Sequence, residues 1–408
     1  MKTHSRLLST ADEIKALADA LKGRETIAFD TEFIREQTFF PIVEIIQVAT
    51  SEESWLVDAK AFKRGFAHGP DGSFDPGIQP LLDVFQDPAV LKIVHAAQGD
   101  QECLYTSFKI VASPILDTAV AASLCGYGEG VGLGKLLKSV LGVMIKKGHA
   151  RTNWAIRPLP EQLLEYALAD VEHLVALGQR LLEQLDELGR RTWGLELSAK
   201  WSDPSLYEMD AHGLAMRLSR GAHLDKRAHS ALVELVGWRE QRVRQLNVPR
   251  RWVADDAVLM DLARVRPKDI EHLSTFRGLN KGELKHSGEL ILSALKRASE
   301  VGDSGFRDST RPDIPSSSES QVLDLLRCYL GILADQHKIA LKHLTTVTQL
   351  LPLLRAPLDK PEDLIKAGVL NEHAAKLVGD ELLHFVKGKR ALSISNREVS
   401  VVELKGSG

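Results

Sequence analysis

The chain contains few cysteines and no long apolar run. Cys103, Cys125 and Cys328 are its only cysteines among 408 residues, odd in number and widely spaced. This excludes a disulfide framework and a zinc cluster, and it indicates reduced thiols in a cytoplasmic protein. No stretch of about 18 apolar residues occurs, and the charged N-terminus has no long apolar region behind it. We therefore expect neither secretion nor a membrane span.

The chain also has little net charge, only −3, but that charge is unevenly spread. Residues 1–200 carry −6, whereas residues 211–300 carry +6. A basic segment can attract a polyanion, although an ordinary solvated surface is the alternative. Contents of 44% hydrophobic and 26% charged residues are typical of a globular protein, and 408 residues predict two or three domains.

The first segment that carries chemistry is an apolar strand-like run, 26–29, followed by Asp30 and Glu32. Side chains alternate along a strand, so the two carboxylates project from one face. Like charges a few ångströms apart repel unless a cation lies between them, so the pair invites a hard divalent metal. Taken alone, the pair could equally be a strand end that runs into a turn or a helix cap.

Two later segments add further acids. Asp100 follows a second apolar strand, 92–96, at the start of a helix, where an acid also complements the helix dipole. Tyr166 and Asp170 lie four residues apart in a helical pattern and share one face. They could simply be a buried tyrosine hydrogen-bonded to a carboxylate. The order of the three segments favours one common metal site over three separate structural roles.

Together the three segments resemble the exonuclease motifs of the DEDD superfamily, in its tyrosine-bearing branch. The flanking sequence is similar to the ribonuclease D family over about residues 10–300, and the similarity is carried by residues 38–41, 45–47, 95–97, 126–129, 133, 151–154 and 157–159. Asn153 stands where that family often has aspartate, and Val43 and Ile45 stand where leucine is more common. None of these departures touches an expected metal ligand.

The resemblance implies an α/β, ribonuclease H-like fold, with a mixed five-stranded sheet and helices, followed by two all-α domains of the helicase-and-ribonuclease-D C-terminal (HRDC) type. The pattern itself predicts an antiparallel meander over 26–29, 43–49 and 55–59, and a surface insertion within 60–78. The expected domains are an exonuclease domain, an HRDC domain, a linker, a diverged HRDC-like domain and a disordered or edge-strand tail, over 1–205, 211–300, 301–319, 320–392 and 393–408.

The activity implied by the resemblance is 3′-to-5′ hydrolysis of RNA with two divalent metal ions, Mg²⁺ or Mn²⁺, releasing 5′-monophosphate nucleotides. The expected metal ligands are Asp30, Glu32, Asp100 and Asp170. Tyr166 completes the catalytic set by orienting the attacking water and helping its deprotonation. The expected partners are transfer-RNA precursors with 3′ trailers, and we expect a monomer without an obligate protein partner.

Eight residues are weaker candidates for RNA contacts. A cationic run, 146–157, surrounds one tryptophan, which suits single-stranded RNA but equally suits a surface loop anchored by a buried tryptophan. Four arginines cluster around a helix end near residue 247. The candidates are Phe33, Gln47, Arg151, Trp154, Arg242, Arg244, Arg250 and Arg251. The glycine-rich segment 126–135 is interpreted as a structural loop, because no strand leads into it.

Two other functions stay open at this point. The chain could be a DNA exonuclease of the same superfamily, because recognition of the RNA 2′-hydroxyl depends on positions that the sequence does not identify. It could also be a catalytically silent RNA-binding adaptor. The complete acidic set argues against an adaptor, since charges that repel without a metal have no use there.

Overall fold

The computed structural model describes residues 2–63, 74–145, 152–220, 222, 224–276, 278–279, 281–301 and 315–404. The chain divides into two compact units. The first unit comprises Met1–Ile115, Lys146–Val175 and Ala199–Arg311, and the second comprises Leu116–Ile145, Ala176–Ser198 and Pro312–Gly408.

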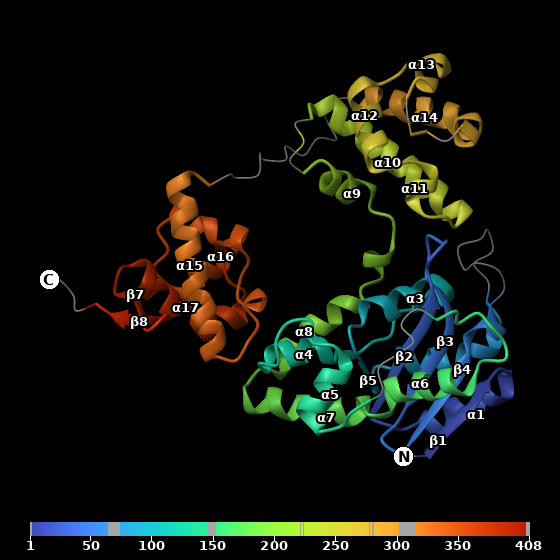
Figure 1. The fold of residues 1–408 in the computed structure, drawn as a ribbon, viewed down its shortest axis with the longest axis horizontal. Helices are drawn as coiled ribbons and strands as arrows, with labels where there is room; N and C mark the ends of the chain where they lie inside the picture. Colours follow the sequence, from blue (N-terminus) through green and yellow to red (C-terminus); the bar gives the residue numbers. More distant parts are fainter. Residues whose placement is uncertain are drawn as a thin grey trace. The chain divides into compact units, whose positions relative to one another are not determined.

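A mixed sheet organises the N-terminal part of the chain (Figure 1). Its strands are β1 (Lys2–Leu8), β2 (Thr26–Ile34), β3 (Ile42–Ala49), β4 (Glu53–Asp58), β5 (Leu91–Val94) and β6 (Ile115–Asp117), in the order β1-β4-β3-β2-β5-β6. The expected antiparallel meander is β2, β3 and β4, while β1 and β5 pair in parallel with β4 and β2. The mixed α/β fold is confirmed, but the sheet has six strands where five were predicted.

Neither β1 nor β6 was located from the sequence. β6 has only three residues, which is too short to show an alternating pattern. β1 pairs with β4, whose partner residues lie about 50 positions further along the chain, so no local turn signal announces the pairing.

Apolar side chains cover both faces of this sheet. One face packs against three helices, α1 (Ala11–Leu21), α2 (Gln79–Gln86) and α3 (Gln98–Phe108). Phe29 of β2 lies at the centre of that core, 4.9 Å from the ring of Phe85. The other face packs against α6 (Glu161–Glu172), with Ile45 and Leu56 of the sheet beneath it. The acidic segments therefore lie on one strand of this sheet, β2, and on two helices that pack against it, α3 and α6.

The C-terminal part of the first unit is all helical. Its helices are α9 (Ala211–Leu218), α10 (Lys226–Leu246), α11 (Arg250–Val253), α12 (Asp256–Val265), α13 (Ile270–Ser274) and α14 (Lys281–Val301). They enclose a core of their own, in which α10 and α14 contribute Leu235 and Ile291. We refer to α9–α14 as the helical module.

The second unit combines helices from three stretches of the chain. They are α4 (Thr118–Leu124), α5 (Leu133–Leu141), α7 (Leu174–Glu187), α8 (Arg191–Ala199), α15 (Ser317–Gln336), α16 (Pro361–Lys366) and α17 (Glu372–Val386). Arg190, in the middle stretch, links the other two, because its guanidinium donates to the carbonyl oxygens of Leu124 and His337 at 2.6 and 2.7 Å. Short 3₁₀ helices lie at Ala59–Phe62, Pro76–Ile78, Lys200–Ser202, Pro204–Tyr207, Leu341–His343 and Val347–Leu354.

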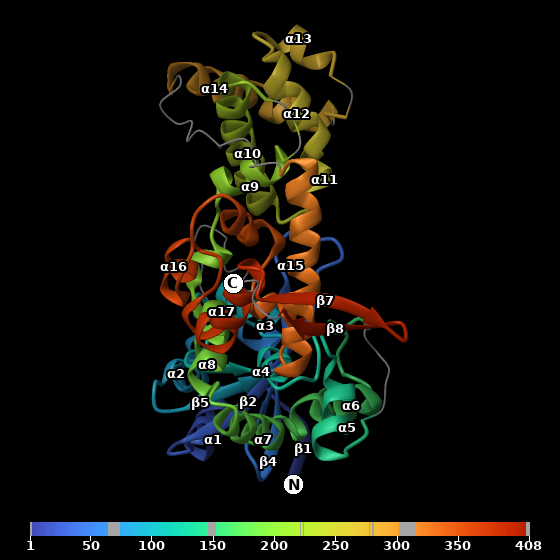
Figure 2. The same cartoon turned by 90° about the vertical axis from the view of Figure 1, so that its left-hand side faces the viewer.

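Two expectations about the C-terminal part need adjustment. The predicted tail forms a two-stranded ribbon, β7 (Arg390–Ser395) with β8 (Glu398–Glu403), which begins before residue 393 (Figure 2). α15 begins inside the predicted linker, because Ser316 and Glu319 form a capping box there. Most of that linker, and most of the predicted insertion, lie outside the described residues. No helix of the described chain is long and apolar enough to cross a bilayer.

Candidate active site

β2 carries Asp30 and Glu32 within the strand rather than at its end. Asp30 lies opposite Gln47 of β3, and Glu32 lies opposite Ile45, whose side chain packs under α6. The register shifts immediately after Glu32, which marks a β-bulge. The i, i+2 spacing therefore directs both carboxylates toward the face that α6 covers.

Asp100 reaches the site from α3, in the first turn of that helix. The helix begins at Gln98, after Ala96 adopts a left-handed conformation with φ 60°. The Thr31 hydroxyl donates to Asp100 Oδ1 at 2.6 Å. Thr31 was not among the predicted site residues, although its place between two acids was visible in the sequence.

Tyr166 and Asp170 lie one helical turn apart on α6, as their spacing predicted. The Tyr166 hydroxyl hydrogen-bonds to the Asp170 carboxylate. Burial, followed by the charges of Asp170 and Glu32, raises the pKa of Tyr166 above its ordinary value. The phenol therefore keeps its proton at neutral pH, and in this structure it is a hydrogen-bond donor rather than a base.

The four carboxylates share one electrostatic environment. Burial, followed by the charges of the other three, raises the pKa of Asp30 well above its ordinary range. Burial, followed by the charges of Asp170 and Asp100, raises the pKa of Glu32 from 4.5 to about 8. Burial raises the pKa of Asp170 to about 6, although the hydrogen bond from Tyr166 opposes this. The four carboxylates therefore do not all ionise near neutral pH unless a positive charge binds among them.

The donor chemistry of this cluster fits a hard divalent cation, which prefers carboxylate oxygens. Within the described part of the chain, however, no three carboxylate, imidazole or thiolate groups already converge on one metal position. Two carboxylates have other hydrogen-bond partners, since Asp100 accepts from Thr31 and Asp170 from Tyr166. An ionised carboxylate has about four lone-pair sites, so one such hydrogen bond leaves each side chain able to bind a metal ion as well.

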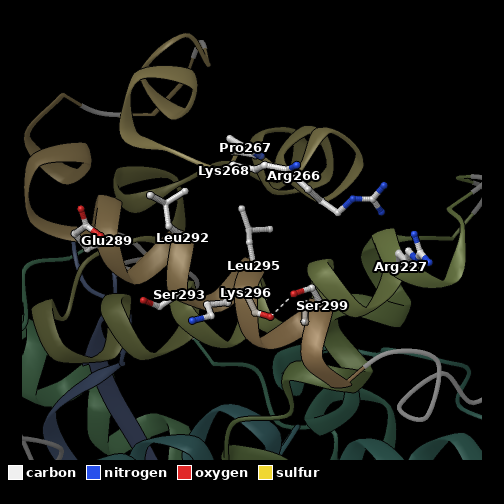
Figure 3. A pocket seen from close by; sticks show the side chains of 11 residues that line it. Arg227, Arg266, Pro267, Lys268, Glu289, Leu292, Ser293, Leu295, Lys296 and Ser299 are labelled. Carbon is white, nitrogen blue, oxygen red and sulfur yellow. Dashed lines mark hydrogen bonds between the residues drawn. The ribbon is translucent and has the colours of Figure 1, made fainter.

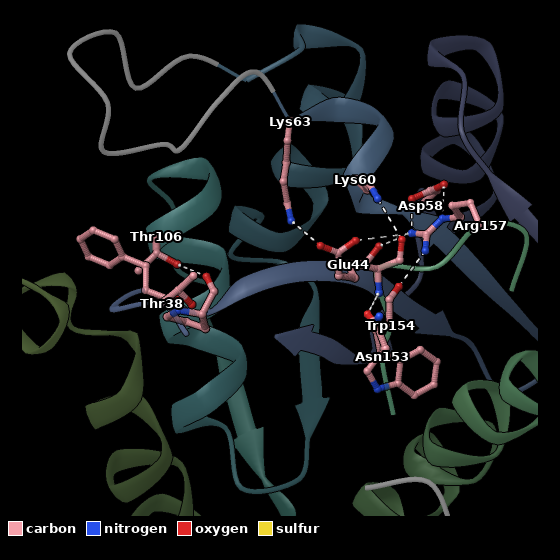
Figure 4. A network of polar contacts seen from close by, with 12 residues as sticks. Thr38, Glu44, Asp58, Lys60, Lys63, Thr106, Asn153, Trp154 and Arg157 are labelled. Atoms are coloured by element: carbon pink, nitrogen blue, oxygen red, sulfur yellow. Dashed lines mark hydrogen bonds and ion pairs between the residues drawn. The ribbon is translucent and has the colours of Figure 1, made fainter. Parts of the chain in front are cut away.

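The loop before α6 is held by Arg157 (Figure 4). Its guanidinium donates to both carboxylate oxygens of Asp58 at 2.9 and 2.6 Å, and to the carbonyl oxygen of Trp154 at 2.7 Å. Lys60 donates to the carbonyl oxygen of Ala155 at 2.9 Å. Arg157, which belongs to the cationic run, therefore fixes the segment that leads into α6, the helix of Tyr166.

Trp154 is not placed to stack on a base. Its side chain is only 3% exposed and packs under α6, with its ring 6.2 Å from that of Tyr166. The buried-anchor interpretation of this loop is therefore the one the structure supports. Arg151, the other RNA candidate in the loop, lies outside the described residues.

Phe33 and Gln47 both lie beside the acidic cluster. The Phe33 ring is partly buried against the core and faces the first turn of α3, since a Cβ at Gly99 would lie 3.8 Å from it. Gln47 is fully buried opposite Asp30, so it is not exposed to a nucleic acid in this structure. Neither amide atom of Gln47 has a hydrogen-bond partner among the described residues.

Three of the four predicted arginine contacts are engaged within the protein. Arg242 pairs with Glu283 at 2.7 Å, and Arg250 donates twice to Glu240, at 2.7 Å each. Arg244 lies over the ring of Phe39, 5.1 Å from its centroid. These three therefore stabilise the helical module and its junction, and their partners were invisible in the sequence because they lie on other elements.

Arg251 differs from these three. It is exposed and forms no ion pair with a described residue. It lines a cavity of about 580 Å³ together with the half-exposed Trp252. Asn247, which the sequence did not single out as functional, ends α10 in a left-handed conformation and contacts the β2–β3 connection.

The comparisons with known proteins agree with this arrangement. Residues 6–186 match the family model of a 3′-5′ exonuclease, and residues 229–295 match that of the HRDC domain. Ribonuclease D of Gluconacetobacter diazotrophicus is 31% identical over 397 residues, which is 96% of this chain and 95% of that protein. The chain belongs to the ribonuclease D family. It is accordingly a hydrolase, a 3′-5′ exoribonuclease of the ribonuclease D type.

Other members show the same extent of similarity. Ribonuclease D of Acidiphilium cryptum is 30% identical, covering 98% of this chain and 97% of that protein. The crystal structure of Escherichia coli RNase D, at 24% identity, superposes with a TM-score of 0.74 and covers 94% of this chain and 98% of that one. The ribonuclease D fold therefore extends over nearly the whole chain, including its C-terminal helices.

Proposed function

We propose that this ribonuclease D family member removes nucleotides from RNA 3′ ends by hydrolysis that depends on two divalent metal ions, Mg²⁺ or Mn²⁺. The observation that carries the proposal is the set of four carboxylates from β2, α3 and α6, in which burial and the charges of the neighbouring carboxylates raise the pKa values of Asp30 and Glu32, and burial raises that of Asp170. A protein has no structural need for such repulsion, whereas bound cations would offset it.

In this proposal Asp30, Glu32 and Asp170 would hold one metal ion, while Asp30 and Asp100 would hold the other. Bound there, divalent cations would activate the attacking water and neutralise the negative charge that develops on the leaving 3′ oxygen. The Tyr166 hydroxyl donates a hydrogen bond to Asp170 and keeps its proton, so the lone pairs of its oxygen can accept a hydrogen bond from that water and orient it. The oxygen of the water forms a bond to phosphorus and the bond from phosphorus to the 3′ oxygen of the preceding nucleotide breaks. The water loses a proton, the leaving 3′ oxygen takes one up to become a hydroxyl, and a 5′-monophosphate nucleotide is released.

We further propose an exonuclease domain over 1–205, an HRDC-type domain over 211–300 and a second HRDC-type domain that begins with α15 and ends before β7, acting as a monomer in the cytoplasm. Transfer-RNA precursors with 3′ trailers are the proposed substrates. Two observations support a structured RNA substrate. The helical module matches the HRDC model, and the similar Escherichia coli enzyme is described as an exoribonuclease involved in structured RNA processing.

The proposal is tested with an RNA hairpin that carries a single-stranded 3′ tail and a 5′ label, beside a DNA of the same sequence. With Mg²⁺ or Mn²⁺ we expect a ladder that shortens from the 3′ end of the RNA, and no cleavage in EDTA. Asp30→Asn should lower the rate by about 10³-fold or more with the fold intact, since it removes a ligand of both ions. Asp83→Asn, an exposed aspartate on α2, is the matched control.

Cleavage from the 5′ end, or none with either metal, would overturn the proposal. Faster degradation of the DNA would favour the DNA exonuclease. RNA binding without cleavage by the wild-type protein would indicate the silent adaptor.

A further inference from the structure

A groove on the helical module gathers four cationic side chains (Figure 3). It has a volume of about 990 Å³ and lies along α14, between the start of α10 and the connection from α12 to α13. Its lining residues are Arg227, Arg266, Pro267, Lys268, Glu289, Leu292, Ser293, Leu295, Lys296, Ala298 and Ser299. Four of these side chains are cationic and one is anionic.

The four cations have few partners in the protein. Arg227, Lys268 and Lys296 are exposed, and none of them forms an ion pair with a described residue. Among the described residues, the guanidinium of Arg266 forms one ion pair, with Asp225 at 3.5 Å, and this pair is open to solvent. This differs from Arg242 and the other engaged arginines described above. An unpaired cation can neutralise a phosphate, and the release of the counterions that were condensed on the nucleic acid then favours binding.

The cations come from three distant parts of the chain, so they are not one charged face of a single helix. Arg227 lies in the first turn of α10, Arg266 ends α12 with φ 54°, and Lys296 lies on α14. In Figure 3 the Arg266 side chain extends toward the side where Arg227 lies, and Leu292 and Leu295 separate this end from Glu289. The two arginines thus lie at the end of the groove away from its one carboxylate, while Lys268 and Lys296 lie along its middle.

Other cavities of the first unit lack this charge pattern. A cavity of about 780 Å³ between the β2–β3 connection and the helical module is lined by four arginines, but also by Glu102, Glu208, Asp210 and Glu240. The cavity beside Trp252 has Arg251 as its only charged lining residue. Among these three cavities, only the α14 groove presents an excess of several positive charges to a polyanion.

We propose that the α14 groove binds the phosphate backbone of the RNA substrate, at nucleotides away from the 3′ end that is being cut. This inference rests on the proposed function, because it takes structured RNA as the substrate. Arg227 and Arg266 contact phosphates at one end of the groove, while Lys268 and Lys296 contact them along α14. The groove holds the body of the RNA and takes no part in the hydrolytic step.

The test compares two full-length double variants that remove equal charge. Arg227→Gln with Lys296→Gln empties the groove of two cations. Arg264→Gln with Lys285→Gln removes two exposed cations of the same module outside the groove. Thermal melting checks that both variants fold. Fluorescence anisotropy with the labelled hairpin, between 50 and 200 mM salt, gives the affinity and its salt dependence, and hydrolysis of a four-nucleotide RNA gives the activity of the catalytic site.

We expect the groove variant to bind the hairpin about 10-fold more weakly at low salt, with a log–log salt slope reduced by about two units, one for each lost contact. The control variant should bind like wild type, and both should hydrolyse the short RNA at the wild-type rate. Equal weakening of binding by both variants, or an unchanged affinity and salt slope in the groove variant, would contradict the proposal that the groove binds RNA. A wild-type protein that cannot hydrolyse the short RNA would instead overturn the proposed function.

Discussion

The side-chain oxygen of Asn247 accepts a hydrogen bond from the backbone N–H of Phe40 at 3.0 Å. It also accepts the neighbouring N–H of Phe39 at 3.1 Å. Asn247 is 6% exposed and ends α10, whereas the two phenylalanines belong to the connection from β2 to β3. One amide of the helical module thus fixes the chain that leads from the acidic strand to its neighbour.

Loss of this amide should loosen the β2–β3 connection. In Asn247→Gly the left-handed backbone conformation at this position remains accessible. The side-chain oxygen is lost, however, so the N–H groups of Phe39 and Phe40 lose their acceptor, at a cost of about 1–3 kcal/mol each. We expect a lower urea midpoint and faster hydrogen exchange at the Phe39 and Phe40 amides. Asn247→Asp keeps an acceptor oxygen and should preserve protection. Equal exchange rates in the glycine variant and wild type would show that the contact is not retained in solution.

The sequence could predict the acidic site but not this junction. Asp30 and Glu32 were assigned to one strand face because the period of two is a local property, and Tyr166 and Asp170 to one helix face for the same reason. The roles of Arg244 and Arg250 depend on Phe39 and Glu240, which no local pattern connects to them. The excess of positive charge in residues 211–300 was correctly counted, but counting cannot separate paired from unpaired cations.

The stability of the metal-free protein should fall as pH rises. The pKa of Glu32 is raised from 4.5 to about 8, so the folded chain binds more protons than the unfolded chain between these values. Its stability contribution is therefore fully present below about pH 4 and is lost as pH rises through about 8. In EDTA we expect the melting temperature to decrease from pH 6 to pH 9, and less steeply in Glu32→Gln.

Adding Mg²⁺ should reverse this trend, because the ion binds the ionised carboxylates of the folded chain. Asp83→Asn, on the exposed face of α2, controls for loss of one carboxylate. If Glu32→Gln and wild type show the same pH slope in EDTA, the carboxylates do not repel one another as described.

Removal of the Tyr166 hydroxyl should slow hydrolysis and shift its pH profile. In Tyr166→Phe the ring keeps its contact with Trp154, so stability should change little. The attacking water loses an orienting partner, which we expect to lower the rate by about 10²-fold. The lost hydrogen bond normally lowers the pKa of Asp170, so the acid limb of the profile should move to higher pH. A slower enzyme with an unmoved acid limb would contradict the hydrogen bond to Asp170.

Gln47 offers a test of whether a buried polar side chain serves stability or the site. Its amide is fully buried opposite Asp30 without a hydrogen-bond partner among the described residues, a situation that costs about 1–3 kcal/mol. Methionine has a similar shape and no amide, so Gln47→Met should leave stability unchanged or raise it. If the amide instead helps to hold the Asp30 carboxylate in place, the same variant should lose activity. We therefore expect an equal or higher melting temperature together with a reduced kcat. A lower melting temperature with unchanged kcat would assign Gln47 to packing alone.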